Sequence, residues 1–291
     1  MPNLEDIRAF VAIGEAGGLA AAGRRLSLTK SVMSRRLARL EADIGVRLLA
    51  RNSRGVSLTE GGATYLEYAS RIIAESDAAD EALAPAGELR GRLRIAAPLS
   101  AVDLLGPLLA EFAVQHSHLE MQVSYSDKIT DVVGEGFDAA VRGGFLSDST
   151  LLARRLTAFE GRLVASPGYL ARRGAPRSLA ELMDHDAVLL GNEAWPLRDG
   201  DTTTTLRPRG RFKADSGHAL VAATEAGLGI ALLPAFLTTN AIAAGRLVTL
   251  LPDHPMPPAG FFLVRPPGGR APRKVSLLAD FLTERLPHSN L

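Results

Sequence analysis

A polar and basic face on one predicted helix contains the residue types that could contact nucleic acid. The helix runs from Thr29 to Ile44, and no carboxylate precedes Glu41 on the face formed by Ser31, Ser34, Arg35 and Arg39. The major groove of DNA admits an α-helix and offers the guanine O6 and N7 atoms as acceptors for arginine. A solvated surface helix can carry the same face, because basic residues commonly lie opposite a buried stripe. The surrounding charges and elements must therefore decide between the two interpretations.

The charge around this helix favours the nucleic-acid interpretation. Between residues 24 and 54 there are nine Lys and Arg residues and two Asp and Glu residues, a balance of nine minus two, or +7. The whole chain of 291 residues carries a formal charge of only +1. Such a local concentration of positive charge is typical of a surface that contacts phosphates.

The other residues that could do chemistry form no catalytic or metal-binding pattern. The chain has no cysteine, which excludes a disulfide framework, a thiolate nucleophile and thiol-based redox sensing. Its six histidines are scattered, and the sequence contains no G-x-S-x-G. The pair Gly227-x-Gly229 comes between a predicted helix and a predicted strand, which reverses the order of a dinucleotide-binding loop. We therefore expect a protein that is not an enzyme, with no catalytic residues, no metal site and no cofactor.

Two short helices must position the basic face. The apolar side chains of the second helix lie four, three and four residues apart and form one buried stripe: Met33, Leu37, Leu40 and Ile44. A first helix from Leu19 to Leu26 precedes it, and Ser27 to Thr29 form the turn, with Thr29 as the N-cap. This arrangement predicts a helix-turn-helix. We expect Thr29, Lys30, Ser31, Ser34, Arg35 and Arg39 to face DNA.

A two-stranded wing is predicted directly after the second helix. Extended runs at 46–51 and 56–58 flank a polar tip that contains Gly55. Arg51 and Arg54 lie where a wing would meet the phosphate backbone or the minor groove. A solvated hairpin without a DNA contact is the alternative.

A long helix follows, with Thr59 as its cap and its end near Pro85 and Gly87. Residues 61–90 carry two basic and six acidic side chains, a net charge of −4, which argues against DNA contact. An imperfect apolar stripe, which Tyr65 and Ile72 broaden, indicates a helix–helix seam formed by Leu66, Ala69, Ile73, Ser76, Asp80 and Leu83. We interpret this helix as a dimerisation linker; burial inside the same protomer is the alternative.

From residue 92 the periodicity changes to alternating strands and helices, which predicts an α/β fold. Predicted strands lie at 93–97, 119–125, 138–142, 163–165, 187–190, 211–213, 230–233, 247–250 and 261–264. Predicted helices lie at 103–115, 129–135, 179–183, 218–226 and 274–286, and Thr202 to Thr205 are a variable loop or an edge strand. In open α/β sheets, ligands bind at the carboxyl ends of strands and against helix N-termini. Ser100 and Ser216 each follow a strand and precede a helix, so their helix ends would attract an anion.

The sequence from Leu4 to Ile73 resembles the winged helix-turn-helix of LysR-type transcriptional regulators. The matching residues are Phe10, Ala21-Ala22…Leu26, Ser34-Arg35…Leu40-Glu41…Gly45-Val46-Arg47-Leu48-Leu49…Arg51 and Leu58-Thr59-Glu60-Gly61-Gly62. The chain departs from the family where a Gln-Pro pair usually opens the recognition helix, since it has Lys30-Ser31 there. It also has Gly18 and Ala20 where Ser and Thr are usual.

The rest of the chain resembles the effector domain of the same family, which is similar to periplasmic binding proteins. The matching stretches are 91–95, 136–142, 165–170 and 227–234. The resemblance implies two Rossmann-like α/β lobes joined by two crossing strands, with an effector cleft lined by Ser100, Ser126, Asp127, Arg142 and Ser216. Each residue taken alone also has a structural interpretation that fits equally well. Ser100 and Ser216 could only cap helices, and Arg142 could form a surface ion pair with a carboxylate.

These observations predict an all-α winged helix-turn-helix at 1–60, a linker helix at 61–88 and an effector domain at 89–291. Lobe I would contain about 89–163 and 265–291, and lobe II about 164–264. We expect a cytoplasmic regulator, without a membrane span, that binds promoter DNA as a homodimer or homotetramer and responds to a small carboxylate between the lobes. An uncharged effector held by Leu99, Phe145 and Leu146 is the alternative ligand. A small-molecule-binding or catalytic α/β protein with an incidental basic helix is the alternative function.

Overall fold

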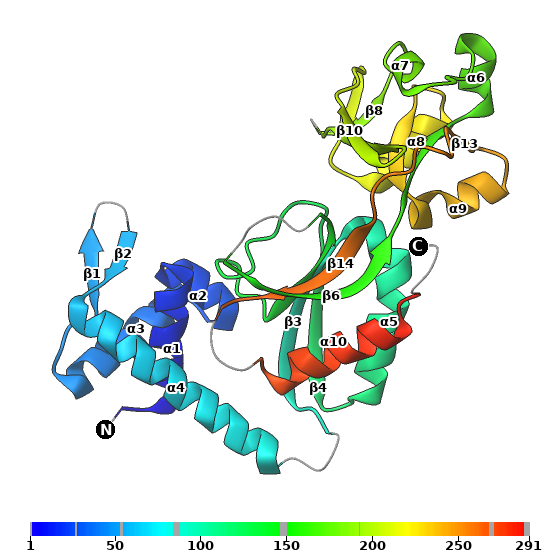
Figure 1. Cartoon of the computed structure of the whole chain (residues 1–291). Helices are drawn as coiled ribbons and strands as arrows, with labels where there is room; N and C mark the ends of the chain where they lie inside the picture. Colours follow the sequence, from blue (N-terminus) through cyan, green and yellow to red (C-terminus); the bar gives the residue numbers. More distant parts are fainter. Residues whose placement is uncertain are drawn as a thin grey trace.

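The computed structural model describes residues 2–26, 28–52, 55–83, 88–145, 150–191, 193–267 and 271–287. It contains a helical N-terminal domain followed by two α/β lobes, with lobe I between the helical domain and lobe II (Figure 1). This architecture confirms the predicted fold class. No helix within the described ranges is long and apolar enough to cross a membrane.

Four helices and one hairpin form the N-terminal domain: α1 (Leu4–Ala16), α2 (Leu19–Leu26), α3 (Lys30–Ile44), β1 (Leu49–Asn52), β2 (Gly55–Leu58) and α4 (Glu60–Leu83). Helix α1 contacts the other three helices, and its buried Phe10 and Ile13 pack with Met33 and Leu40 of α3. The tight α2–α3 connection needs glycine at position 23, because an added Cβ would lie 2.6 Å from the Leu28 carbonyl oxygen. The predicted helix-turn-helix and antiparallel wing are confirmed.

Helix α4 differs from the prediction in the face that it buries. Ala69 is fully buried in the core of the N-terminal domain, and Leu66 and Ile73 pack against the same core. The alternative of burial within the protomer therefore holds for Ala69, whereas Leu66 and Ile73 are only partly buried, and the role of the helix as a dimerisation linker stays a prediction. Ile72, at the edge of the predicted stripe, is 46% exposed, and Tyr68 is 55% exposed, so apolar surface on α4 remains uncovered within the protomer.

Lobe I is built on a five-stranded mixed sheet of order β4-β3-β5-β14-β6. Its strands are β3 (Gly91–Ala97), β4 (Leu119–Tyr125), β5 (Ala139–Gly144), β6 (Leu152–Phe159) and β14 (Ala259–Arg265). The first three are parallel, and β14 runs antiparallel to β5 and β6. The short helix η1 (Leu99–Ala101) leads into α5 (Val102–Gln115), which packs on this sheet beside α10 (Arg273–Arg285).

The prediction of a helix at 129–135 is wrong. Residues 132–136 form turns in which Asp131 accepts hydrogen bonds from the Gly134 and Glu135 amides, and Gly136 has a φ of 72°. A side chain that bonds to its neighbouring backbone competes with helix formation, and the two glycines disfavour the helix further. Val132 and Phe137 instead bury themselves against the second face of the lobe I sheet.

Lobe II is smaller and has its strands in short groups. The set β12-β7-β13 is antiparallel, β8 and β11 are parallel, and β9 and β10 form a hairpin. The strand bounds are β7 (Gly161–Ala165), β8 (Val188–Leu190), β9 (Trp195–Asp199), β10 (Thr202–Leu206), β11 (Phe212–Ala214), β12 (Ala231–Pro234) and β13 (Val248–Leu250). The helices are α6 (Pro167–Arg173), α7 (Leu179–Leu182), α8 (Gly217–Glu225) and α9 (Ala235–Ala243). The sequence reasoning missed β6, β9, α6 and α9, whereas Thr202 to Thr205 lie in an edge strand.

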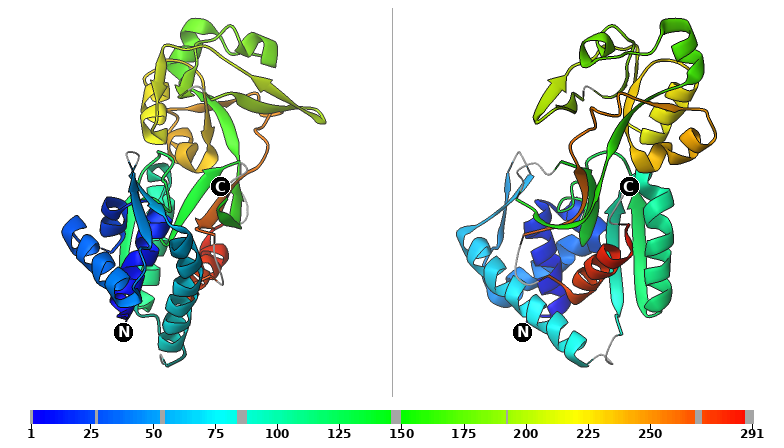
Figure 2. Two further views of the ribbon diagram at one scale, coloured as in Figure 1. Left: turned by 90° about the vertical axis from the view of Figure 1, so that its left-hand side faces the viewer. Right: turned by 45° about the vertical axis from the view of Figure 1, so that its right-hand side comes forward.

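The chain passes between the lobes twice. It leaves lobe I between β6 and β7 and returns on the segment between β13 and β14, and both passages are visible in the two views of Figure 2. Strand β14 belongs to the lobe I sheet from Ala259 onward, although the sequence placed residues up to 264 in lobe II. The passages pack together, because a Cβ added at Gly161 would lie 2.8 Å from the Met256 side chain.

Candidate functional sites

Helix α3 presents the predicted polar and basic face. Thr29 is its N-cap, and the Thr29 hydroxyl accepts a hydrogen bond from the Val32 amide and pairs with the Ser31 hydroxyl at 2.9 Å. Ser31 and Lys30 are exposed in the first turn, and Arg35 is exposed one turn later. Within the described ranges neither Lys30 nor Arg35 has an ion-pair partner, so both remain available to an external anion. Ser34 is half-buried beside them.

Arg39 already has a partner inside the domain. Its Nε and Nη2 atoms donate to the two carboxylate oxygens of Asp6 at 2.5 and 2.6 Å. The hydrogen bonds and charge of Asp6 raise the pKa of Arg39 above its ordinary value. The Asp6 side chain is 1% exposed and the Arg39 side chain is 60% exposed. The ion pair therefore joins a buried carboxylate of α1 to an arginine at the surface of α3. The sequence reasoning missed Asp6, although an acidic residue near the start of an otherwise apolar helix face was a usable signal.

Helix α1 also reduces the positive charge that the sequence implied. Arg36 pairs with Glu5 at 2.7 Å, and Arg25 pairs with Glu15. With Asp6, these carboxylates neutralise three of the nine basic residues between positions 24 and 54. Counting only positions 24–54 omitted them, because they lie earlier in the chain and reach the basic segment through the fold.

The wing is described only in part. Arg51 lies in β1 opposite Val56, and Arg54 lies outside the described residues. The buried Glu41 supports the start of the wing, because its carboxylate accepts hydrogen bonds from the Leu48 and Leu49 amides at 2.8 and 3.1 Å. Glu41 therefore has a structural partner, which explains its position at the edge of an otherwise basic helix.

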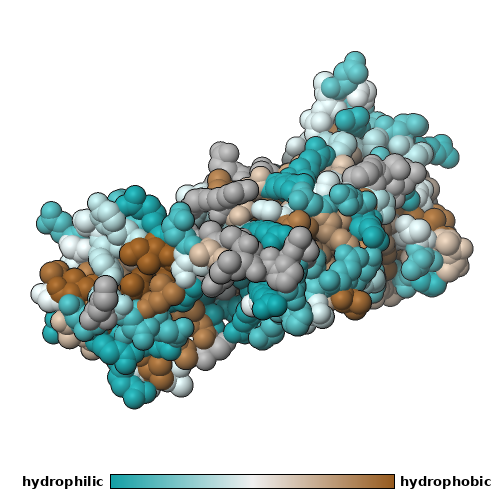
Figure 3. All heavy atoms as spheres, turned by 90° about the horizontal axis from the view of Figure 1, so that it is seen from below, coloured by the Kyte–Doolittle hydropathy of each residue, from teal (hydrophilic) through white to brown (hydrophobic). Residues whose placement is uncertain are grey.

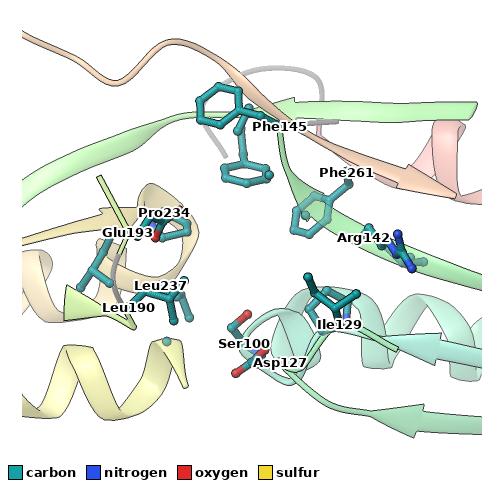
Figure 4. Close-up of a pocket in the computed structure, with 18 of the residues that line it drawn as sticks. Ser100, Asp127, Ile129, Arg142, Phe145, Leu190, Glu193, Pro234, Leu237 and Phe261 are labelled. Carbon is teal, nitrogen blue, oxygen red and sulfur yellow. The ribbon is translucent and has the colours of Figure 1, made fainter. Parts of the chain in front are cut away.

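A cavity of about 360 Å³ lies between the two α/β lobes. Lobe I contributes Ser100, Ser126, Asp127, Arg142 and Phe261, and lobe II contributes Leu190, Glu193, Pro234 and Leu237 (Figure 4). Four of the five residues expected to line an effector cleft are therefore brought together. Ser216 does not line the cavity, whereas its neighbour Gly217 does. A side chain at Gly217 would crowd the opposite lobe, since an added Cβ would lie 3.0 Å from the Ser100 Cβ.

The first helix end at the cleft differs from the prediction. Ser100 lies inside η1 rather than at a cap, and its amide donates to the Asp127 Oδ1 atom at 2.7 Å. The Ser100 amide therefore already donates to Asp127, whereas the sequence predicted that this helix end would bind an anionic ligand. Ser216 is the N-cap residue of α8, but its side chain makes no capping hydrogen bond.

The other polar residues of the cleft are engaged to different degrees. The Arg142 Nη2 atom donates to the Thr130 carbonyl at 2.9 Å, and the Ser126 hydroxyl accepts from the Lys128 amide at 3.2 Å. Lys128 lies at the exposed rim, 3.9 Å from the Asp215 carboxylate. The interpretation of Arg142 as one half of a surface ion pair finds no partner in the described ranges.

Glu193 is a cleft residue that the sequence reasoning missed. Its side chain remains exposed at the cleft mouth, yet desolvation by the surrounding protein raises the pKa of its carboxyl above the ordinary value. No sequence motif marked it, because it lies in the loop before β9. Its position beside the apolar residue Trp195 was the only local signal.

Apolar side chains supply most of the remaining walls. Ile129 is 90% exposed, Phe145 is 54% exposed and Leu190 is 41% exposed, and all three line the cavity. Of the expected apolar residues, Phe145 is therefore in place and Leu99 does not line the cavity; Leu146 lies outside the described residues. Among the described residues no group of three or more His, Asp and Glu side chains could hold a metal ion.

Comparison with known proteins identifies both parts of the chain. Residues 4–63 match the family model described as bacterial regulatory helix-turn-helix protein, lysR family, and residues 86–287 match the LysR substrate binding domain. The HTH-type transcriptional regulator PtxR of Pseudomonas aeruginosa is 35% identical over 295 residues, covering 98% of this chain and 93% of PtxR. CrgA of Neisseria meningitidis, serogroup C, is 35% identical over 259 residues, covering 87% of this chain and 86% of CrgA.

Solved structures agree with these matches over the full length. The structure of CrgA, a LysR-type transcriptional regulator from Neisseria meningitidis, superposes with a TM-score of 0.59 at 33% identity, covering 98% of this chain and 99% of CrgA. The full-length virulence activator AphB of Vibrio cholerae superposes with a TM-score of 0.60 at 27% identity, covering 98% of this chain and 100% of AphB.

Proposed function

Because this chain belongs to the LysR family of transcriptional regulators, we propose that it binds an interrupted inverted repeat in promoter DNA through α3 and the wing. The match of the helix-turn-helix model to residues 4–63 supports this proposal over the alternative of an α/β enzyme or binding protein with an incidental basic helix. The observation that carries the proposal is the pair Lys30 and Arg35, which are exposed on the outer face of α3 and have no ion-pair partner among the described residues. We expect the protein to act in the cytoplasm, where promoter DNA is found, and to have no catalytic activity.

Each expected DNA contact has a definite role in this proposal. Arg35 reads a base edge, and Lys30 with the Ser31 hydroxyl contacts the phosphates at the entry of the groove. Thr29 caps the helix and Ser34 supports the neighbouring turn. Arg39 contributes only with the N–H groups that Asp6 leaves free, and Arg51 and Arg54 contribute from the wing.

LysR-type regulators form oligomers, and we assign one contact between protomers of this chain to the outer face of α4. Tyr68 and Ile72 are large apolar side chains exposed on that face, and apolar surface contributes to the end of the molecule formed by the helical domain (Figure 3). Dimers explain two-fold symmetric half-sites, and pairing of dimers into a tetramer would explain two such sites in one promoter.

The cleft between the lobes is the effector site in this proposal, with Ser100, Ser126, Asp127 and Arg142 on one wall and Ser216 close by. Its residues come from both lobes and two chain passages connect them, so a bound effector changes how the lobes meet. That movement would reach the promoter through the arrangement of the protomers.

The test is selection of DNA followed by a salt titration. Duplexes selected from a random-sequence library should share an inverted repeat whose half-sites are about 10 bp or a multiple of it apart. The logarithm of the affinity should fall linearly with the logarithm of the salt concentration. Lys30→Ala should reduce that slope by about one, whereas Lys213→Ala in lobe II, as a matched control, should not. Failure to enrich any sequence, or a salt-independent affinity, would contradict the proposal.

A further inference from the structure

The polar groups that line the effector cleft are distributed in a way that bears on the chemistry of the ligand. This inference rests on the proposed function, because it assumes that the cleft between the lobes holds the effector. Among the residues that the structure describes, Asp127 of lobe I and Glu193 of lobe II are the carboxylates that line it, and Lys128 and Arg142 are the cations. The hydrogen bonds that these four groups already make within the protein, rather than their number, indicate which class of ligand the cleft can bind.

Only one of the two carboxylate oxygens of Asp127 accepts a hydrogen bond from the described residues. Its Oδ1 atom accepts the Ser100 amide at 2.7 Å, whereas its Oδ2 atom is buried and has no hydrogen-bond partner among the described residues. A buried acceptor without a partner costs free energy, which a donor placed there would recover. An anion placed at the same point would meet a like charge instead.

The two cations are poorly placed to reverse this preference. The Lys128 ammonium is at the rim, where its side chain is 80% exposed and water screens its charge. Arg142 bonds to Thr130 of its own lobe, and Figure 4 shows it beyond Ile129 from Ser100 and Asp127. A ligand group at Ser100 therefore meets the Asp127 carboxylate and not the guanidinium.

The walls around these groups require an apolar ligand body. Ile129, Phe145 and Leu190 are large apolar side chains that the free protein leaves exposed at the cleft. Burying them against an apolar ligand removes that surface from water, which supplies the main driving force for binding in such sites.

We propose that the cleft takes an apolar, ring-sized ligand that carries a protonated amine, with the ammonium donating to Asp127, and that it discriminates against a carboxylate of the same shape. Glu193 on the facing lobe adds a second acceptor for the same cation as the lobes approach. Desolvation raises the pKa of the Glu193 carboxyl, and a ligand cation at the cleft would favour its charged form again. This assignment replaces the small carboxylate expected from the sequence, because the helix end that would have held it is occupied by Asp127.

The chain contains its own reporter of cleft occupancy. Trp195 is the single tryptophan, it is buried, and its neighbours Ala194 and Pro196 both line the cleft. Its fluorescence should therefore respond to a ligand between the lobes. Three probes share one apolar body and differ in the polar group: 2-phenylethylamine, 2-phenylethanol and 3-phenylpropanoate.

The expected result is that the full-length protein binds the amine at least about tenfold more tightly than the carboxylate, with the alcohol between them. Asp127→Asn keeps the acceptor for the Ser100 amide and removes the charge, so it should abolish most of the preference for the amine. Glu193→Gln should reduce the preference less. Asp201→Asn, in the exposed turn between β9 and β10, is the matched control and should leave all three affinities unchanged.

The same titrations contain the outcomes that overturn the inference. Equal or tighter binding of the carboxylate, or no response to the amine, rejects it, and loss of carboxylate binding in Arg142→Met would then assign the cleft to an anion. Circular dichroism and binding of the selected DNA, measured without probes, show that each variant is folded. A protein that binds selected DNA but not the amine loses only this inference, whereas a protein that selects no DNA loses the proposed function.

Discussion

The DNA-binding face and the effector cleft are built from the chain in opposite ways. The face on α3 is formed by residues within one helix, and its supports, Asp6 and Glu41, lie in the same domain. The cleft draws on residues from Ala96 to Phe262 and on both lobes. The difference shows that a surface made by one helix can be read from its periodicity, whereas a cavity depends on which distant segments the fold brings together.

The two regions also differ in how their charges are used. In the helical domain, Glu5, Asp6 and Glu15 of α1 hold arginines in place, whereas Lys30 and Arg35 have no ion-pair partner in the described part of the chain. In the cleft, the Ser100 amide donates to Asp127, and the second carboxylate oxygen has no hydrogen-bond partner among the residues that the structure describes. The first region therefore offers positive charge to a partner and the second offers a hydrogen-bond acceptor.

The largest expected effect comes from breaking the link between α1 and α3. Asp6→Ala leaves the Arg39 guanidinium without the bidentate partner that holds it, and a cavity forms at a fully buried position. We expect the melting temperature of the helical domain to fall by several degrees and specific DNA binding to be lost, with the fluorescence response of Trp195 retained. Glu5→Ala, which removes an exposed partner of Arg36, is the control and should have little effect. Equal losses in the two variants would contradict the structural role of Asp6.

The next effect concerns assembly. Ile72→Asp places a charge on the exposed face of α4 without disturbing the core, because Ile72 is 46% exposed in the protomer. If this face meets a second copy, burying that charge is unfavourable and sedimentation should show smaller species. Loss of the dimer also weakens binding to a two-half-site operator, since each protomer then binds alone. Met183→Asp, at a half-exposed position in lobe II, is the control. An unchanged oligomer would place the contact elsewhere.

A smaller effect is expected at a single base contact. Arg35→Ala should cost about 1–3 kcal/mol of binding free energy on the selected operator and relax the preference at one position. Lys30→Ala should instead weaken all sequences alike. Arg207→Ala, at an exposed position of lobe II, should change neither quantity. An Arg35→Ala protein with wild-type affinity and preference would remove Arg35 from the interface.

The extent of sequence-based prediction follows the same division. The stripe from Met33 to Ile44 and the caps Thr29 and Thr59 are local signals, and the structure confirms the helices they define. The ion pairs of α1 with α2 and α3, and the occupation of the Ser100 amide by Asp127, required the fold, because their partners lie 10 to 33 residues apart in the sequence. The predicted helix at 129–135 failed because Asp131 and two glycines favour turns. The burial of Ala69 of α4 within the protomer was not foreseen, because periodicity cannot tell which surface covers an apolar face. The assignment of the expected DNA and effector residues stays a prediction.

The smallest expected effect is a pH dependence confined to the α/β half of the chain. All six histidines follow residue 115, so the helical domain contains none. In lobe II the Asp186 amide donates to the Tyr169 hydroxyl at 3.0 Å, and that hydroxyl lies 3.0 Å from the His185 Nδ1 atom. The Tyr169 hydroxyl has a proton that it can donate to Nδ1 of the neutral imidazole, so the neutral form has a hydrogen-bond partner in the folded protein. Desolvation, followed by the charge of Arg173, lowers the pKa of His185 below its ordinary value and outweighs the nearby carboxylates.

The sign of the effect follows from this shift. A histidine whose pKa is lower in the folded protein binds its proton more readily in the unfolded chain. Its stabilising contribution is therefore complete above the ordinary pKa near 6.5 and is lost as the pH falls from that value through the lower pKa of the folded protein. The melting transition of the α/β half should therefore move to lower temperature between about pH 7.5 and 5.5, and His116, whose pKa desolvation also lowers, should add to the shift. His185→Gln offers the Tyr169 hydroxyl an acceptor that does not titrate, so it should reduce the pH dependence without removing the part due to His116. Calorimetry at several pH values measures the melting transitions of the helical domain and of the α/β half. An equal shift of the two melting temperatures with pH would show that the pH dependence does not arise from these histidines.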